Sequence, residues 1–266
     1  MLKRLGYDGE YKIVIDVDDV CLDDYVAKYG AENLLVFDKN QWLFVEDTAM
    51  SKDGLIKASP FYARVVVDEY ASRFAIGDYI VLDDDIIDLR VRMPDNGSLR
   101  SMSMRRFNDV LSYLFEFMNE NDIYGLSFAH PGMFIGGVQS FDKVIDKRVG
   151  SNIFLLNSER RLRWKTIFYD DFNTCLSNGQ IGRLVFTIPY IQIHAEPQGS
   201  QSSTTKSNGM GEAYAMTKQF TRSFYSTMLF PSSCSTKQVG KRVGNWWPSM
   251  KLDNQFQKIV SDKFRR

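Results

Sequence analysis

The stretch GDYIVLDDDIIDLRV, residues 77–91, decides how the fold is interpreted. Residues 78–82 form a short apolar run of the length and composition typical of a buried strand. Asp83, Asp84 and Asp85 follow at once, and adjacent carboxylates repel one another. The three aspartates therefore need either water, as in a solvated turn, or a bound cation to make the arrangement tolerable.

Strand-like and helix-like segments alternate before this stretch. Residues 11–16 and 33–38 are expected to be strands, and residues 21–30 between them a helix that Gly30 ends. Ser59 and Pro60 have the side chains expected at the start of the next helix, which we expect to end at Gly77. This strand–helix–strand–helix–strand order predicts an α/β fold with a mostly parallel central sheet and flanking helices.

The second half of the chain continues the mixed pattern. Apolar residues at helical spacing predict a helix over about residues 102–119, and strands are expected at 124–130 and 152–157. Residues 199–211 are rich in glycine and serine, which predicts a surface loop. The stretch 241–251, KRVGNWWPSMK, is basic and aromatic.

Composition excludes some classes of function. The 266 residues include 33 lysines and arginines and 33 aspartates and glutamates, so no net field attracts nucleic acid or anionic lipid. Any polyanion must be bound by a local patch. The three cysteines form no CxxC pair, and no apolar run approaches the roughly 18 residues of a spanning helix. These features predict a cytoplasmic protein with no membrane partner and no structural zinc.

The aspartate run has two interpretations. Asp83 and Asp85 point the same way from an extended backbone and could share a hard cation such as Mg²⁺ or Mn²⁺. In the alternative, the carboxylates accept hydrogen bonds from the backbone of a tight, solvated turn. The apolar run before them favours the metal. Another acidic group, Asp16, Asp18 and Asp19, is the weaker candidate because the strand before it is shorter.

A second acidic pair begins a predicted short helix. Asp170 and Asp171 could cap that helix and interact with its dipole, which is the simpler explanation. Alternatively, one of them is a general base or orients an acceptor hydroxyl. His130 and His194 each follow an apparent strand, and His194 also precedes the predicted loop. A lone histidine is more often structural than a ligand.

Basic residues occur beside aromatic ones in two places, residues 160–165 and residues 241–251. Such a mixture suits phosphate contact combined with base stacking. An ordinary surface charge cluster is the alternative, which the zero net charge supports.

The order of these motifs resembles a known family. The segments YKIVID, NLLVF, SPFYARVVVDEYA and YIVLDDDI follow one another as in the nucleotide-sugar half of GT-A fold glycosyltransferases. The chain is most similar to the TET-associated glycosyltransferases of phages, which add sugars to 5-hydroxymethylated pyrimidines in DNA. The resemblance covers roughly residues 11–231.

The resemblance implies roles for particular residues. Asp83 and Asp85 would bind the divalent metal, Mn²⁺ or Mg²⁺, with His194 as a third ligand, and Asp84 would belong to the donor site. Arg64 and Lys57 would approach the nucleotide-sugar donor, expected to be a UDP-sugar. Asp170 and Asp171 match the acceptor-side carboxylates. The acceptor would be DNA containing 5-hydroxymethylcytosine or a related base, and a phage-encoded protein would act in the host cytoplasm.

The same resemblance predicts the domain organisation. One glycosyltransferase domain is expected over residues 1–231, with the nucleotide-sugar half at about 1–100 and the acceptor half at about 101–231. Residues 232–266 would form a basic aromatic tail. The chain starts close to the second strand of the GT-A pattern, so the usual first strand is expected to be absent. Two alternatives remain: a non-catalytic module that binds nucleotide or nucleic acid, and a glycosyltransferase acting on protein or carbohydrate.

Overall fold

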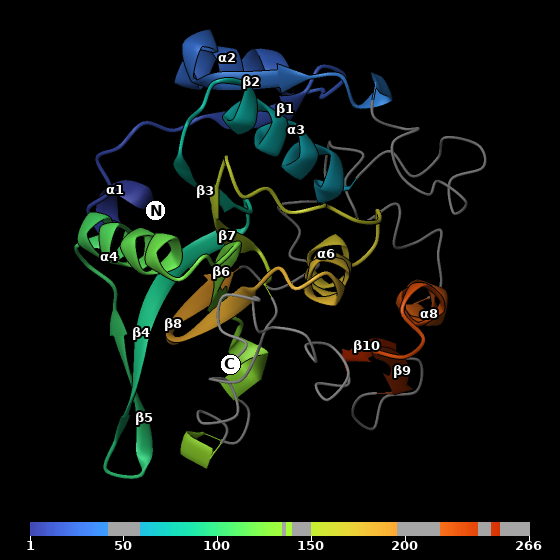
Figure 1. The fold of residues 1–266 in the computed structure, drawn as a ribbon. Coiled ribbons are helices and arrows are strands. Elements are labelled where there is room, and N and C mark those ends of the chain that lie inside the picture. Colours follow the sequence, from blue (N-terminus) through green and yellow to red (C-terminus); the bar gives the residue numbers. More distant parts are fainter. Residues whose placement is uncertain (42–58, 135–136, 140–149, 196–218, 239–245, 251–266) are drawn as a thin grey trace. The chain divides into compact units, whose positions relative to one another are not determined.

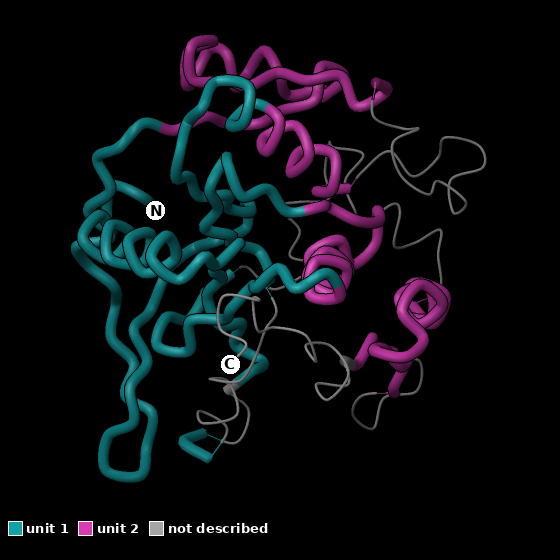
Figure 2. The backbone as a smooth tube through the Cα atoms, viewed as in Figure 1, with its two compact units in different colours: residues 1–10, 70–162, 181–197 teal, residues 11–69, 163–180, 198–266 magenta. Residues whose placement is uncertain are grey.

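The chain divides into two compact units. The computed structural model describes residues 1–41, 59–134, 137–139, 150–195, 219–238 and 246–250. Figure 2 distinguishes unit 1, which comprises residues 1–10, 70–162 and 181–197, from unit 2, which comprises residues 11–69, 163–180 and 198–266. Both units contain helices and strands, so the expected α/β class is confirmed at this level.

Unit 1 is built on a six-stranded sheet with the order β3-β7-β6-β8-β4-β5 (Figure 1). The pairing of β6 with β8 is parallel, whereas the other four pairings of neighbouring strands are antiparallel. The sheet is therefore mixed, which corrects the expectation of a mostly parallel sheet. The strands are Asp78–Leu82 (β3), Ile86–Asp95 (β4), Ser98–Ser103 (β5), Gly125–Ala129 (β6), Ile153–Asn157 (β7) and Val185–Ala195 (β8).

The antiparallel pairing of β4 with β5 follows from their short connection. Parallel neighbours need a crossover of a dozen or more residues, whereas antiparallel neighbours can be joined by a two-residue turn. The turn between β4 and β5 consists of Asn96 and Gly97, whose φ angles are 46° and 81°. Positive φ at both positions suits the twist of a tight hairpin, and Asn-Gly is its strongest sequence signal. The parallel pair β6 and β8 is joined by a long connection that includes β7 and a helix.

Helix α4 (Phe107–Glu120) covers one face of this sheet. Its buried side chains belong to the same apolar cluster as Leu89, Leu126 and Phe128 of the strands, which are 0% exposed. Each fully buried side chain of this size stabilises the fold by about 1.5–3 kcal/mol relative to exposure. The helix starts at Phe107 rather than near Met102, because Met102 is paired with Val91 in the β4–β5 hairpin.

Unit 2 begins with a β–α–β segment in which Ile13–Asp16 (β1) and Leu34–Phe37 (β2) pair in parallel. Helix α2 (Leu22–Tyr29) connects them, so the three elements predicted for this region are confirmed. Helix α3 (Pro60–Arg73), of which residues 60–69 belong to unit 2, begins, as predicted, directly after Ser59. Ser59 Oγ accepts a 3.2 Å hydrogen bond from the amide of Phe61. This is the bond expected of an N-cap serine.

The rest of unit 2 consists of α6 (Asp170–Gln180) and a C-terminal group of elements. Helix α8 (Gln219–Leu229) precedes β9 (Cys234–Gln238) and β10 (Trp246–Met250), which pair antiparallel. Leu176 of α6 packs with Phe230 and Cys234, which follow α8. The last 35 residues, expected to be a tail, thus include two regular strands.

Some predicted features lie outside the described residues, namely Lys57 and the loop over residues 199–211. No helix in the described part of the chain combines the length and the apolar character needed to cross a bilayer.

Candidate functional site

The first candidate site lies in unit 2, where an irregular loop leads into α6. Thr166 and Tyr169 of this loop have φ angles of 68° and 50°, in the left-handed region that most side chains avoid. Such backbone persists only where the surroundings over-determine it, and it is concentrated at functional sites. The residues that hold this loop therefore determine the geometry of the candidate site.

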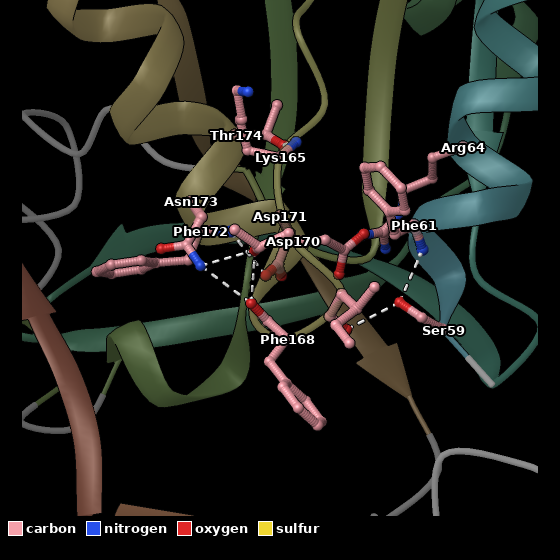
Figure 3. Close-up of polar contacts among 12 residues, drawn as sticks. Ser59, Phe61, Arg64, Lys165, Phe168, Asp170, Asp171, Phe172, Asn173 and Thr174 are labelled. Atoms are coloured by element: carbon pink, nitrogen blue, oxygen red, sulfur yellow. Dashed lines mark hydrogen bonds and ion pairs between the residues drawn. The ribbon is translucent and has the colours of Figure 1, made fainter. Parts of the chain in front are cut away.

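The loop is held by buried polar side chains of α6 (Figure 3). The Asn173 amide donates to Thr166 Oγ1 at 2.9 Å and to the carbonyl oxygen of Phe168 at 3.0 Å. The next residue, Thr174, accepts from the amide of Lys165, and Asn178, one turn after Thr174, bonds the backbone of Arg163. All three helical side chains are 0% exposed. Because buried polar groups need partners, these bonds fix the loop rigidly on the helix.

Helix α3 holds the same loop through Ser59. Its hydroxyl donates to the carbonyl oxygen of Ile167 at 2.8 Å while it caps the helix (Figure 3). One hydroxyl thus serves both α3 and the loop that ends in the acidic pair.

Arg64 and Asp170 form a buried ion pair within unit 2. Arg64 Nη1 lies 2.5 Å from Asp170 Oδ2, and the two side chains are 4% and 8% exposed. The Arg64 guanidinium also lies over the indole of Trp164, 5.7 Å from the ring centre. Taking two charges out of water is expensive, and good geometry with further contacts is what compensates for it. Asp170 is therefore fixed in position by its arginine.

Asp171 has a different environment from its neighbour. Its side chain is only partly buried, and Oδ1 accepts a 2.7 Å hydrogen bond from the amide of Phe172. Both carboxylates lie in the first turn of α6, where the helix dipole favours negative charge. Sequence reasoning placed both at a helix start, and only the structure separates a buried, arginine-paired carboxylate from a more accessible one.

The C-terminal elements also contact this loop. The Tyr169 hydroxyl lies 3.3 Å from Ser223 Oγ of α8, and its ring packs on Trp247 of β10 with centroids 5.9 Å apart. Ser223 in turn donates to the carbonyl oxygen of Trp246 at 2.8 Å. Tyr169 directly precedes the acidic pair, so α8 and β10 help to place it.

The second candidate site is the aspartate run in unit 1. Asp83, Asp84 and Asp85 form the whole connection between β3 and β4. The Asp83 amide donates to the carbonyl oxygen of Asn152 at 2.9 Å, which fixes the start of the turn. Asp84 is exposed, whereas Asp83 and Asp85 are partly buried. Three carboxylates are thus held on a short, anchored turn at the end of a strand.

His194 lies at the same end of this sheet. The register pairs Ile86 with Ala195 and Asp88 with His194, so the turn that ends at Ile86 is adjacent in the sheet to the end of β8. Directly opposite residues project from the same face, which places the exposed His194 beside the buried Asp88. Asp88 is bound by Arg4 Nη2 at 3.1 Å.

Within the residues that the structure describes, no three histidine, cysteine, aspartate or glutamate side chains are grouped as a metal site. An oxygen site for Mg²⁺ is nonetheless often made of one or two carboxylates, with phosphates of the substrate completing the coordination. The Asp83–Asp85 turn fits that pattern of donors.

The other acidic group, Asp16, Asp18 and Asp19 at the end of β1, makes hydrogen bonds and an ion pair with nearby residues. Asp16 pairs with Lys39 Nζ at 3.1 Å and accepts the amide of Asp18 at 2.8 Å. Asp19 accepts the amide of Cys21 at 2.8 Å. These are the bonds of a turn stabilised by aspartate side chains.

The predicted residues therefore form two groups. Asp83, Asp84, Asp85 and His194 belong to unit 1, and Arg64, Asp170 and Asp171 belong to unit 2. The residues that hold the second group were not predicted from the sequence. Polar residues repeating at Asn173, Thr174 and Asn178 on a predicted helix were the available signal.

Comparison with known proteins adds one match. A family model described as TET-Associated Glycosyltransferase matches residues 1–199. No curated protein and no solved structure matches the chain. The matched region contains both acidic groups, whereas α8, β9 and β10 lie beyond it.

The ion pair of Arg64 and Asp170 leads to a prediction about stability. Asp170→Asn should lower the free energy of unfolding by about 3 kcal/mol, because it removes the charge that faces a buried arginine. Asp171→Asn should lower it by about 1 kcal/mol or less, since that carboxylate is more accessible. Urea unfolding of both variants checks this. Arg64→Met combined with Asp170→Asn should lose less than the sum of the single losses, and equal effects of the two asparagine variants would contradict the assignment.

Proposed function

Because the chain belongs to the TET-associated glycosyltransferase family, we propose that it transfers a sugar from a nucleotide-sugar donor to the hydroxyl group of a hydroxymethylated pyrimidine in DNA, with 5-hydroxymethylcytosine as the leading acceptor. The observation that carries this proposal is the family match over residues 1–199. Both acidic groups described above lie inside it. Transfer of a glycosyl group is what the family name itself states.

The Asp83–Asp85 turn is the proposed site of the donor diphosphate. Asp83 and Asp85 would hold a divalent cation, Mn²⁺ or Mg²⁺, and His194 is the candidate third ligand on the adjacent strand. When bound, the cation would neutralise charge on the departing diphosphate. The anchored turn supports this role because it keeps three carboxylates together at one strand end. A UDP-sugar is the proposed donor.

Asp171 is the proposed general base toward the acceptor hydroxyl. Asp170 is less suited to accept a proton, since protonation would remove the negative charge that faces the buried Arg64. The ion pair instead suits Asp170 and Arg64 to a positioning role, in which they hold the first turn of α6. This favours positioning by Arg64 over direct contact with the donor.

The fold is proposed to be a variant of the GT-A arrangement. The parallel β1–α2–β2 segment and the acidic turn after β3 support it. This variant would differ from a mostly parallel sheet, because four of the five strand pairings in the six-stranded sheet are antiparallel.

The experiment that tests the function uses 5-hydroxymethylcytosine DNA, Mn²⁺ and a panel of nucleotide sugars. Mass spectrometry of the released nucleosides should show a mass increase equal to one hexose or pentose residue. Unmodified DNA of the same sequence is the control and should remain unchanged. Transfer to a protein or carbohydrate acceptor, without transfer to DNA, would overturn the acceptor. Binding of DNA without release of nucleoside diphosphate from any donor would indicate a non-catalytic module.

Asp171→Asn tests the proposed base. It should lower kcat by roughly 10²- to 10⁴-fold and leave the KM for the donor within a few-fold, because a base acts in the transition state. Steady-state kinetics measures both quantities. Asp24→Asn, which removes a carboxylate from the first turn of α2, is the matched control and should retain activity. Equal losses in kcat and donor affinity would instead assign Asp171 to a structural cap.

Asp85→Asn tests the proposed cation site. It should weaken Mn²⁺ binding in the presence of UDP by at least about 10-fold, since even groups that only support ligands are worth 10- to 100-fold. Calorimetric titration measures this without relying on turnover. His194→Ala should shift the titration in the same direction, and an unchanged curve would remove His194 from the site. Asp109→Asn, an exposed carboxylate of α4, is the control.

A further inference from the structure

The β4–β5 hairpin and the short segment after it are strongly basic in an otherwise neutral chain. Residues 86–106 contain five arginines and two aspartates, a net charge of +3, whereas the whole chain has 33 basic and 33 acidic residues. The arginines are Arg90, Arg92, Arg100, Arg105 and Arg106. A polyanion that binds this protein needs a local basic surface, because the net field is zero.

The outer part of this hairpin forms a ribbon of two strands at the edge of the sheet. In the register of the sheet, β8 pairs with β4 only from Ile86 to Val91. Among the described residues, β4 pairs only with β5 from Arg92 to Asp95, so the ribbon extends beyond the remaining strands of unit 1 (Figure 1). It is held to the sheet by Leu99, which packs against Ala129, and by Arg92, whose Nε donates to Gln192 Oε1 of β8. The tight Asn96–Gly97 turn closes its tip.

The arginines lie on both faces of the ribbon. Directly opposite residues share a face, and Arg90 is opposite Ser103 on one face while Met93 is opposite Arg100 on the other. Arg90 and Arg100 are both exposed. Met93 is 41% exposed, so an apolar side chain lies on the same face as Arg100. The ribbon is thus basic, exposed and partly apolar on the same surface.

We propose that the β4–β5 ribbon is the surface that binds duplex DNA, and that it does so in the major groove. The major groove, about 12 Å wide, admits a two-stranded β-ribbon. Arginines on both faces suit the phosphates that border the groove on both sides. Because positive side chains lie on both faces of the ribbon, a nucleic acid duplex, with phosphates on both sides of its groove, is the partner that fits this surface.

The inference rests on the proposed function and deepens it. A substituent at C5 of a pyrimidine projects into the major groove, as the methyl group of thymine does. A 5-hydroxymethyl group is therefore displayed in the groove that the ribbon enters. The exposed Met93 would provide apolar contact to base edges there, in the manner of side chains that contact the thymine methyl.

The test compares two double variants that lose the same charge. Arg92→Gln with Arg100→Gln removes one arginine from each face of the ribbon, and Lys28→Gln with Arg73→Gln removes two exposed cations outside it. Fluorescence anisotropy with a 5-hydroxymethylcytosine duplex, at several salt concentrations, measures the affinity of each. The ribbon variant should bind about 10-fold or more weakly at 0.1 M salt, and its plot of log K against log salt should be less steep by about 1.8. The control should match the wild type.

Activity separates this inference from the proposed function. The ribbon variant should glycosylate the duplex more slowly while retaining wild-type turnover of the free 5-hydroxymethyldeoxycytidine nucleoside, which has no phosphates or groove. Equal binding by the ribbon variant and the wild type, or no binding of duplex DNA by the wild type, would overturn the ribbon assignment. An equal loss on single-stranded DNA of the same sequence would overturn docking in the groove. Absence of sugar transfer by the wild type, with the binding difference intact, would overturn the proposed function alone.

Discussion

The buried ion pair of Arg64 and Asp170 constrains the part of unit 2 that carries the second acidic group. Removing both charges from water is expensive, so the pair persists only where its geometry is held by neighbours. Ser59, which caps α3, bonds the loop before Asp170, and Asn173 fixes the same loop from α6. The strained backbone at Tyr169 is the result, and it sets the position from which Asp170 and Asp171 project.

In unit 1 the corresponding constraint is strand pairing. Antiparallel pairing of β4 with β8 sets His194 beside Asp88 and carries the aspartate turn to the same end of the sheet. The same strand then continues past its last contact with β8 and forms the basic ribbon with β5. One long strand therefore links the proposed donor site at its beginning to the proposed DNA surface at its end.

Individual helices and strands could be predicted from the sequence where neighbouring residues encode them. The Ser59–Pro60 start of α3, the strand before Asp83 and the acidic start of α6 were all read correctly, because caps, apolar runs and helix starts are encoded by neighbouring residues. The mostly parallel sheet was wrong, since strand neighbours depend on pairings between distant segments. The β4–β5 hairpin was missed although Asn96–Gly97 is a strong hairpin signal, because the apolar residues around Met102 were assigned to the following helix.

The kinds of groups available are encoded in the sequence: consecutive aspartates after a strand, an acidic pair before a helix, and arginines concentrated in residues 90–106. What each group contacts depends on the folded chain. It paired Asp170 with an arginine 106 positions away while leaving Asp171 partly accessible, and it extended the basic hairpin past the last pairing of β4 with β8. The physical reason is that burial and charge pairing are properties of the space around a side chain, and residues distant in sequence create that space.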